Sequence, residues 1–137
     1  MTKYVCGFMF NEDLSQVALI VKNKPEWQKG VLNGIGGKIE IGESGLDAMI
    51  REFKEETGLH YEDWRPLLSL REDDWQVLFF FAKCPHQHFA DIDTTTDEEV
   101  LKANMDYLPS LATIDNLQWL VPMAEYFLRK PTYIFSK

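Results

Sequence analysis

Short apolar runs alternate with polar turns along most of the chain. Residues 4–10 and 16–21 have the length and the aromatic and β-branched content of buried strands, with a polar turn at 11–13 between them. The same reasoning predicts further strands, near residues 31–35, 67–71, 76–83 and 100–105. Residues 85–96 are expected to form a loop, and residues 132–135 a last strand or an ordered tail.

Two segments have helical rather than strand periodicity. In residues 44–57 the apolar positions recur three and four residues apart, at Leu46, Met49, Ile50 and Phe53. Ser44 with Asp47 resembles a capping box, and Gly58 suits the left-handed position after the last turn. Residues 117–128 form a second amphipathic pattern, in which Pro122 is an expected irregularity. Mixed strands with two main helices predict an α/β fold, an α/β/α sandwich with a mixed sheet.

Composition is consistent with one domain over residues 1–137. A hydrophobic content of 45% argues against disorder, no apolar run reaches transmembrane length, and the start lacks a signal peptide. We therefore expect a cytoplasmic protein with no membrane partner, either a monomer or a homodimer. Cys6 and Cys84 lie in apolar surroundings and are interpreted as buried free thiols. The net charge of −8 disfavours duplex nucleic acid as a partner, because such binders normally carry a basic surface.

The second half of the first helix carries an unusual density of charge. Glu52, Glu55 and Glu56 fall on one side of the helix, where like charges repel by a few tenths of a kcal/mol per pair. A divalent cation relieves that repulsion, and oxygen ligands favour Mg²⁺ or Mn²⁺ over zinc. Arg51 lies four residues before Glu55 and is placed to steer it, while Glu43 is placed to hold Arg51 from the loop. The alternative is an acidic face that is simply solvated.

The residues around this cluster carry a more specific pattern. The pattern closely resembles the Nudix box. It consists of a glycine, five residues, Glu, seven residues, Arg-Glu, a bulky apolar residue, any residue, Glu-Glu, any residue, a glycine and a bulky apolar residue. Every fixed position is filled, by Gly37, Glu43, Arg51, Glu52, Phe53, Glu55, Glu56, Gly58 and Leu59. The resemblance implies the Nudix sandwich, hydrolysis of a diphosphate link, and magnesium as the cofactor, with manganese as a substitute.

The resemblance also implies roles for individual residues. Glu52 and Glu56 would be the main metal ligands, with Glu55 in support and the backbone carbonyl of Gly37 as a further ligand; Arg51 belongs to the same catalytic set. Lys38 and Glu40 would lie near the phosphates, although a plain turn also accounts for Lys38. A loop carboxylate commonly completes the site or acts as base, and Glu98, then Glu99, falls where it is expected. An acidic loop that is merely solvated is the alternative.

The glycines at positions 34, 36 and 37 do not form a standard phosphate-binding loop. No Ser or Thr follows Lys38, and the dinucleotide-binding spacing is absent. We interpret the glycines as allowing close backbone approach, such that a side chain at Gly36 or Gly37 would block the site.

Substrate contacts are predicted from resemblance to the oxidised-purine nucleoside triphosphatases within the family. Asn33, in the run from Leu32 to Lys38, and Asp115 with Asn116 match positions that contact the base there. A turn residue is the alternative for Asn33, and a helix N-cap is the alternative for Asn116. Trp27 is the aromatic residue best placed for a lid over the base, because it lies in a polar loop.

The sequence thus predicts a magnesium-dependent pyrophosphohydrolase that converts a nucleoside triphosphate to the monophosphate and pyrophosphate. An oxidised purine is one candidate base. The first alternative is hydrolysis of ADP-ribose, a nucleotide sugar or another nucleoside diphosphate derivative. The second is a non-catalytic Nudix-fold regulator that binds nucleotide, although such modules can lose the glutamates that this chain retains.

Overall fold

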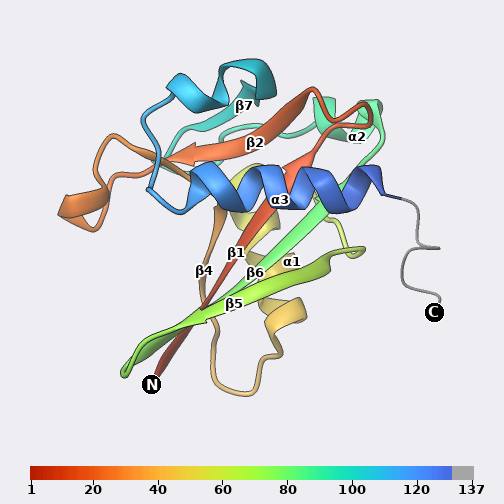
Figure 1. The fold of residues 1–137 in the computed structure, drawn as a ribbon. Helices are drawn as coiled ribbons and strands as arrows, with labels where there is room; N and C mark the ends of the chain where they lie inside the picture. Colours follow the sequence, from red (N-terminus) through yellow and green to blue (C-terminus); the bar gives the residue numbers. More distant parts are fainter. Residues whose placement is uncertain (131–137) are drawn as a thin grey trace.

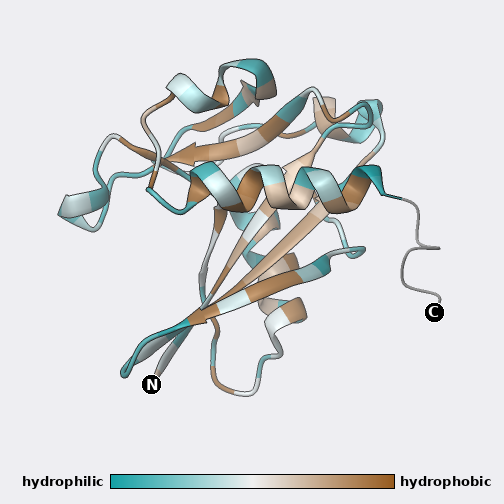
Figure 2. Ribbon diagram, in the orientation of Figure 1, coloured by the Kyte–Doolittle hydropathy of each residue, from teal (hydrophilic) through white to brown (hydrophobic). Residues whose placement is uncertain are grey.

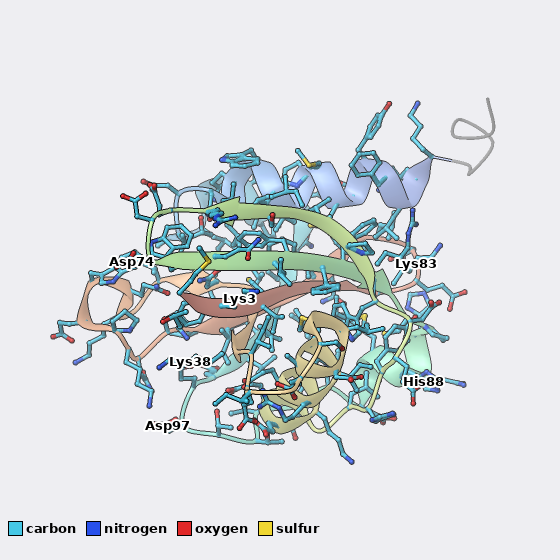
Figure 3. The ribbon with its side chains drawn as sticks, turned by 90° about the horizontal axis from the view of Figure 1, so that it is seen from below. Lys3, Lys38, Asp74, Lys83, His88 and Asp97 are labelled. Atoms are coloured by element: carbon cyan, nitrogen blue, oxygen red, sulfur yellow. The ribbon has the colours of Figure 1, made fainter. Side chains whose placement is uncertain are left out.

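A mixed seven-stranded sheet lies between two long helices in the computed structural model, which describes residues 1–130 (Figure 1). The strands are β1 (Thr2–Phe10), β2 (Gln16–Val21), β3 (Leu32–Asn33), β4 (Ile35–Lys38), β5 (Arg65–Arg71), β6 (Trp75–Lys83) and β7 (Val100–Asn104). The long helices are α1 (Gly45–Thr57) and α3 (Leu117–Arg129). Figure 3 shows the three layers edge on, with the sheet separating α1 from α3. The predicted α/β class with a mixed sheet is confirmed.

β1 organises the sheet because it pairs with three other strands. It runs parallel to β6 along its whole length and antiparallel to β2 and β4. One edge of β1 is divided: residues 4–7 pair with β4, and Met9 and Phe10 pair with β2. β3 pairs with β2 instead, so the chain changes partner at Gly34, between β3 and β4. The strand predicted at 31–35 is therefore two short strands.

Side chains alternate between two cores, one on each face of the sheet. In β1, Phe8 and Phe10 pack on the α3 side, while Val5 and Met9 pack on the α1 side. β6 repeats the alternation with Phe79 and Phe81 against Phe80 and Ala82. In Figure 2 the central strands are mostly hydrophobic, and hydrophobic and hydrophilic residues alternate along α3. A sheet covered on both faces explains why these strands are almost continuously apolar.

Both ends of α1 carry the caps that the sequence predicts. The Ser44 hydroxyl accepts a hydrogen bond from the backbone N–H of Asp47 at 3.0 Å, and Gly58 adopts a φ of 81° after the last turn. The buried residues of α1 are Ala48, Met49, Phe53 and Thr57. Leu46 is 41% exposed, so its predicted place in the buried stripe is wrong: it lies in the first turn, outside the series that repeats every four residues from Met49.

α3 confirms the second predicted helix and ends one residue later. Leu117, Leu120, Val121 and Ala124 are buried, and Pro122 lies on the exposed side, where the missing N–H is tolerated. Cys6 and Cys84 are buried and free, as predicted.

Local structure departs from the prediction in three loops. The segment 85–96 contains a short helix, α2 (His86–Ala90), and two 3₁₀ helices occur at η1 (Glu26–Gln28) and η2 (Met105–Ser110). The strand expected to reach Met105 ends at Asn104, whose side chain accepts from Asp106 N–H and starts η2. The prediction for residues 132–135 lies outside the described residues. Within residues 1–130, every helix is too short or too polar to cross a membrane.

We expect Phe53→Ala to lower the free energy of unfolding by about 3–5 kcal/mol, because Phe53 is fully buried and packs edge-on against Trp64 with ring centroids 5.0 Å apart. Urea denaturation followed by circular dichroism measures the loss. Lys54→Ala, at the exposed next position of α1, is the matched control and should stay within about 0.5 kcal/mol of wild type. Equal losses in the two variants would contradict the assignment of Phe53 to the core.

Candidate functional site

Arg51 ties the loop before α1 to the helix. Its guanidinium donates two hydrogen bonds to the Glu43 carboxylate, from Nε at 2.7 Å and from Nη2 at 2.9 Å. Nη2 also donates to the backbone carbonyl of Lys38 at 3.0 Å, at the end of β4. Charge-assisted, two-pronged contacts of this kind are among the strongest that side chains make. The predicted contact between Glu43 and Arg51 is confirmed, and strand, loop and helix are held in one arrangement.

The same guanidinium faces two carboxylates on its own helix. Nη1 lies 2.7 Å from Glu52 Oε2 and 3.4 Å from Glu55 Oε1, so Glu52 is the closer partner. The hydrogen bond from Arg51 lowers the pKa of Glu43 to about 2, and the pKa of Arg51 is raised chiefly by the same bond. Arg51 is therefore a permanent positive charge inside an acidic cluster.

Glu52 and Glu56 differ from Glu55 in exposure. Both are partly buried, and burial raises the pKa of each carboxyl group, while neighbouring carboxylates act in the same direction. The side chain of Glu55 is 54% exposed. Thr96 Oγ1 donates to Glu56 Oε2 at 2.9 Å, and Thr95 Oγ1 donates to the backbone carbonyl of Glu55. The loop after α2 is thus attached to the acidic face of α1.

That loop brings one of its two candidate carboxylates inward. Glu98 is buried, 3.3 Å from Lys22 Nζ, and accepts the backbone N–H of Asn23 at 2.6 Å. Burial acts to raise the pKa of Glu98, but the Asn23 N–H and the Lys22 ammonium outweigh it and lower the pKa. The Glu98 charge in turn raises the pKa of Glu56. Glu99 is exposed. Glu98, rather than Glu99, therefore faces the acidic cluster.

The two glycines of β4 serve different purposes. A β-carbon at Gly37 would lie 2.5 Å from the Glu52 carboxyl group, so the strand backbone lies against that carboxylate. A β-carbon at Gly36 would instead collide with the backbone carbonyl of Val5 on β1. The expectation that a Gly36 side chain would block the site is wrong, because Gly36 serves strand pairing; for Gly37 the close approach to the site is confirmed.

The donor atoms around Glu52 suit a hard divalent cation. Carboxylate oxygens of Glu52 and Glu56 and the adjacent Gly37 backbone supply oxygen alone, which Mg²⁺ and Mn²⁺ prefer. Among residues 1–130, no three His, Cys, Asp or Glu side chains already converge as a finished metal site. Glu52 is turned towards Arg51, and Glu56 towards Thr96. The residues fit the cation once these carboxylates exchange those partners for metal.

A cleft of about 590 Å³ opens beside this cluster. Its lining combines Gly37 and Lys38 of β4 with Trp27, Asn33 and Asn116. Figure 3 places Lys38 and Asp97 on the α1 side of the sheet, whereas His88 lies at the far end. Trp27 is 73% exposed and borders a second cleft of about 500 Å³, which Asp115 lines instead. Trp27 and Asn116 line both clefts, so the structure brings them together with Asn33 in the first cleft and with Asp115 in the second.

The alternatives weighed for two of these residues are tested by their hydrogen bonds. Asn116 occupies the N-cap position of α3, but its side chain makes no capping hydrogen bond. Asn33 lies on β3, paired with Ile20, and its Oδ1 accepts the N–H of Gly34 at 2.8 Å. The alternative role of a helix cap therefore does not explain the Asn116 side chain, and that of a turn residue does not explain Asn33.

Two cleft residues were not identified from the sequence. Lys22 lines the cleft while pairing with Glu98, and Gln28 lines it from η1. Both precede the recognisable motif, in a polar loop without periodicity, so no local signal marks them. Lys22 is placed at the cleft by its contact with Glu98, 76 positions away in the sequence, and Gln28 by the shape of its loop.

Comparison with known proteins agrees with this geometry. The family model of the NUDIX domain matches residues 2–129. The mRNA-decapping protein g5R of African swine fever virus is 29% identical over 97 residues, which are 69% of this chain; the chain covers 38% of that relative's length. A solved MutT structure, from work on Aliivibrio salmonicida and Vibrio cholerae, superposes with a TM-score of 0.76 at 21% identity, over 92% of this chain and 98% of that one.

The fold also occurs in a regulator. The NUDIX domain of Shewanella oneidensis NrtR, in complex with ADP ribose, gives a TM-score of 0.73 at 16% identity, over 92% of this chain and 87% of that one. NrtR in complex with a 27mer DNA gives 0.74 at 15% identity, over 91% and 61%. These likenesses establish the fold, and the expectation that this chain binds no duplex nucleic acid stays a prediction.

We expect Gly36→Ala to affect stability and Gly37→Ala to affect Mn²⁺ binding. Gly36→Ala should lower the free energy of unfolding by about 1–3 kcal/mol, because its β-carbon meets strand backbone that cannot move aside. Gly37→Ala should keep the fold but displace the Glu52 carboxylate and weaken Mn²⁺ binding about tenfold. Urea denaturation and calorimetric Mn²⁺ titration measure the two effects. Unchanged Mn²⁺ affinity in Gly37→Ala would argue against a cation at Glu52.

Proposed function

Because the chain belongs to the Nudix family of pyrophosphate-bond hydrolases, we propose that it cleaves a nucleoside triphosphate to the monophosphate and pyrophosphate with the help of Mg²⁺. One observation carries the proposal. A single cleft extends from Gly37 and Lys38, beside the carboxylates, to Trp27, Asn33 and Asn116. A polyphosphate at one part of this cleft would leave its base within reach of an aromatic ring and two amides.

The phosphate end depends on charge compensation. With a net charge of −8, the protein needs cations to hold a polyanionic substrate. Glu52 and Glu56 would hold Mg²⁺ with the Gly37 carbonyl, and Glu55 would support them. The bound ion supplies charge neutralisation and a water of lowered pKa. Lys38 and Lys22 line the cleft, so their ammonium groups would add positive charge near bound phosphates.

The chain's own residues position these groups. Arg51 fixes the Lys38 carbonyl and the Glu43 loop, so that β4 and α1 keep the same spacing while substrate enters. Glu98 is the preferred general base because, of the two loop carboxylates, it is the one whose charge raises the pKa of Glu56, while Lys22 lies 3.3 Å from it. A base of this kind would take a proton from the attacking water.

The base end is the basis for preferring nucleotides. Trp27 presents an exposed indole to the cleft, and stacking on a purine would bury the ring. Asn33 and Asn116 provide amide groups that hydrogen-bond to a base edge. An oxidised purine stays one candidate base, because the Asn116 amide offers an acceptor oxygen as well as donor hydrogens. Buried free thiols at Cys6 and Cys84 favour a reducing compartment such as the cytoplasm.

Hydrolysis of a nucleoside diphosphate derivative is the second candidate. It is favoured by the relative described as an mRNA-decapping protein and by the ADP ribose bound to the NUDIX domain of NrtR. A non-catalytic nucleotide-binding regulator is the third, and the retained set of Glu52, Glu55 and Glu56 argues against it.

We expect the wild-type protein with Mg²⁺ to release pyrophosphate from nucleoside triphosphates, and Glu56→Gln to reduce kcat at least about 100-fold, because loss of a metal ligand should cost at least as much as loss of its supporting contacts. A panel of triphosphates, ADP-ribose, a nucleotide sugar and a capped RNA, with product identification, measures both. Glu62→Gln, an exposed carboxylate outside the cluster, is the control and should keep full activity.

The panel separates the candidates. Release only from ADP-ribose or capped RNA would replace the triphosphate assignment by the second candidate. Nucleotide binding without release from any substrate would identify a regulator.

A further inference from the structure

A chain of three hydrogen-bonding groups lines the base end of the cleft. The backbone N–H of Gly34 donates to Asn33 Oδ1 at 2.8 Å, and Asn33 Nδ2 donates to Gln28 Oε1 at 3.3 Å. The Cys6 thiol, 3.8 Å away, also donates to Asn33 Oδ1. Asn33, Gln28 and Cys6 all line the cleft, so the chain runs along its wall.

The direction of this chain is fixed at its first member. A backbone N–H can only donate, so the side-chain atom of Asn33 that faces Gly34 must be the oxygen. Rotating the amide by 180° would oppose two donors at 2.8 Å. The Cys6 thiol is also a donor to Asn33 Oδ1, because burial raises the pKa of the thiol to about 12 and keeps it protonated. Asn33 therefore donates from Nδ2 to Gln28, so the atom of Gln28 that accepts this hydrogen bond is Oε1.

The end of the chain is consequently an N–H donor. With Oε1 engaged, Gln28 keeps Nε2 for the cleft, and within residues 1–130 this amide donates to no protein atom. The loop that carries Gln28 is held by its backbone: Lys22 N–H donates to Val31 O at 2.9 Å, Val31 N–H to Gln28 O at 3.1 Å, and Gly30 N–H to Lys22 O at 2.8 Å. Gln28 is thus held in place with a fixed polarity.

We propose that Gln28 is a specificity-determining residue: with Asn33 it presents amide donors to the nucleobase and selects bases whose edge carries a carbonyl oxygen. This inference rests on the proposed nucleotide substrate and states which bases the cleft prefers. A 6-oxo purine offers O6 and N7, both acceptors, whereas adenine offers N7 and the N6 amino donor. Two N–H groups can donate to both acceptors of the 6-oxo purine, whereas at adenine one of them would face the N6 amino donor.

The inosine and adenosine nucleotides give a matched pair, because they differ at the purine 6-position and the adjoining N1 proton. We expect wild type to favour ITP over ATP at least about tenfold in kcat/KM, a ratio that one well-placed hydrogen bond supplies. Gln28→Glu replaces the outward donor by an acceptor and should lower the ITP/ATP ratio at least about tenfold, through KM rather than kcat. Gln28→Leu should bring the ratio towards one without reversing it.

The controls separate local chemistry from charge and folding. Gln87→Glu, on the exposed side of α2, adds the same charge away from the cleft and should keep the wild-type ratio. Repulsion between the new carboxylate and the phosphates affects both nucleotides alike, so it cancels in the ratio. Thermal unfolding of each variant confirms that it is folded.

The outcomes also distinguish this inference from the proposed function. An ITP/ATP ratio near one in wild type, or a ratio unchanged in Gln28→Glu, would overturn the inference while leaving triphosphate hydrolysis intact. If no triphosphate is cleaved, calorimetric binding of IMP and AMP applies the same comparison: a preference for IMP that Gln28→Glu removes supports the inference, and equal or absent binding overturns it.

Discussion

The Arg51 guanidinium lies where three separate pieces of the chain must meet. It contacts the carboxylate of Glu43 in the loop, the carbonyl of Lys38 on β4, and the carboxylates of Glu52 and Glu55 on α1. Without a cation at this point, the helix would bring Glu55 beside the partly buried Glu52 and Glu56, and charge repulsion would oppose its packing. Arg51 removes much of that repulsion within the protein itself. The proposed metal site would therefore be built around a positive charge that the fold already carries.

The sheet supports this arrangement by changing strand partners. β1 pairs with β4 over residues 4–7 and with β2 over Met9 and Phe10, so the chain changes partner at Gly34, and Gly34 lines the cleft. Both faces of β1 and β6 are packed against helices, so the floor of the cleft is rigid. The acidic helix packs on the opposite face of the sheet, where Met49 and Phe53 are buried in the second core.

Local sequence signals predicted the features that local physics controls. The caps at Ser44 and Gly58, the helices and the central strands follow from patterns within a few residues, and the structure confirms them. The division of β3 from β4 depends on how distant elements meet, because β3 pairs with β2 and β4 pairs with β1. Lys22 and Gln28 were not predicted for the same reason. Lys22 pairs with Glu98, which lies 76 positions away in the sequence, and Gln28 is positioned by backbone hydrogen bonds within its loop. The roles of the site residues themselves stay predictions.

The division of β1's edge has a consequence for how such a protein can diversify. The box helix and β4 are interlocked through main-chain contacts and Arg51, so substitutions there disturb several elements at once. The walls around Trp27, Gln28 and Asn116 come from connecting segments that carry little of either core. Substitutions in those segments would therefore reshape the wall of the cleft while leaving the contacts between β4 and α1 in place.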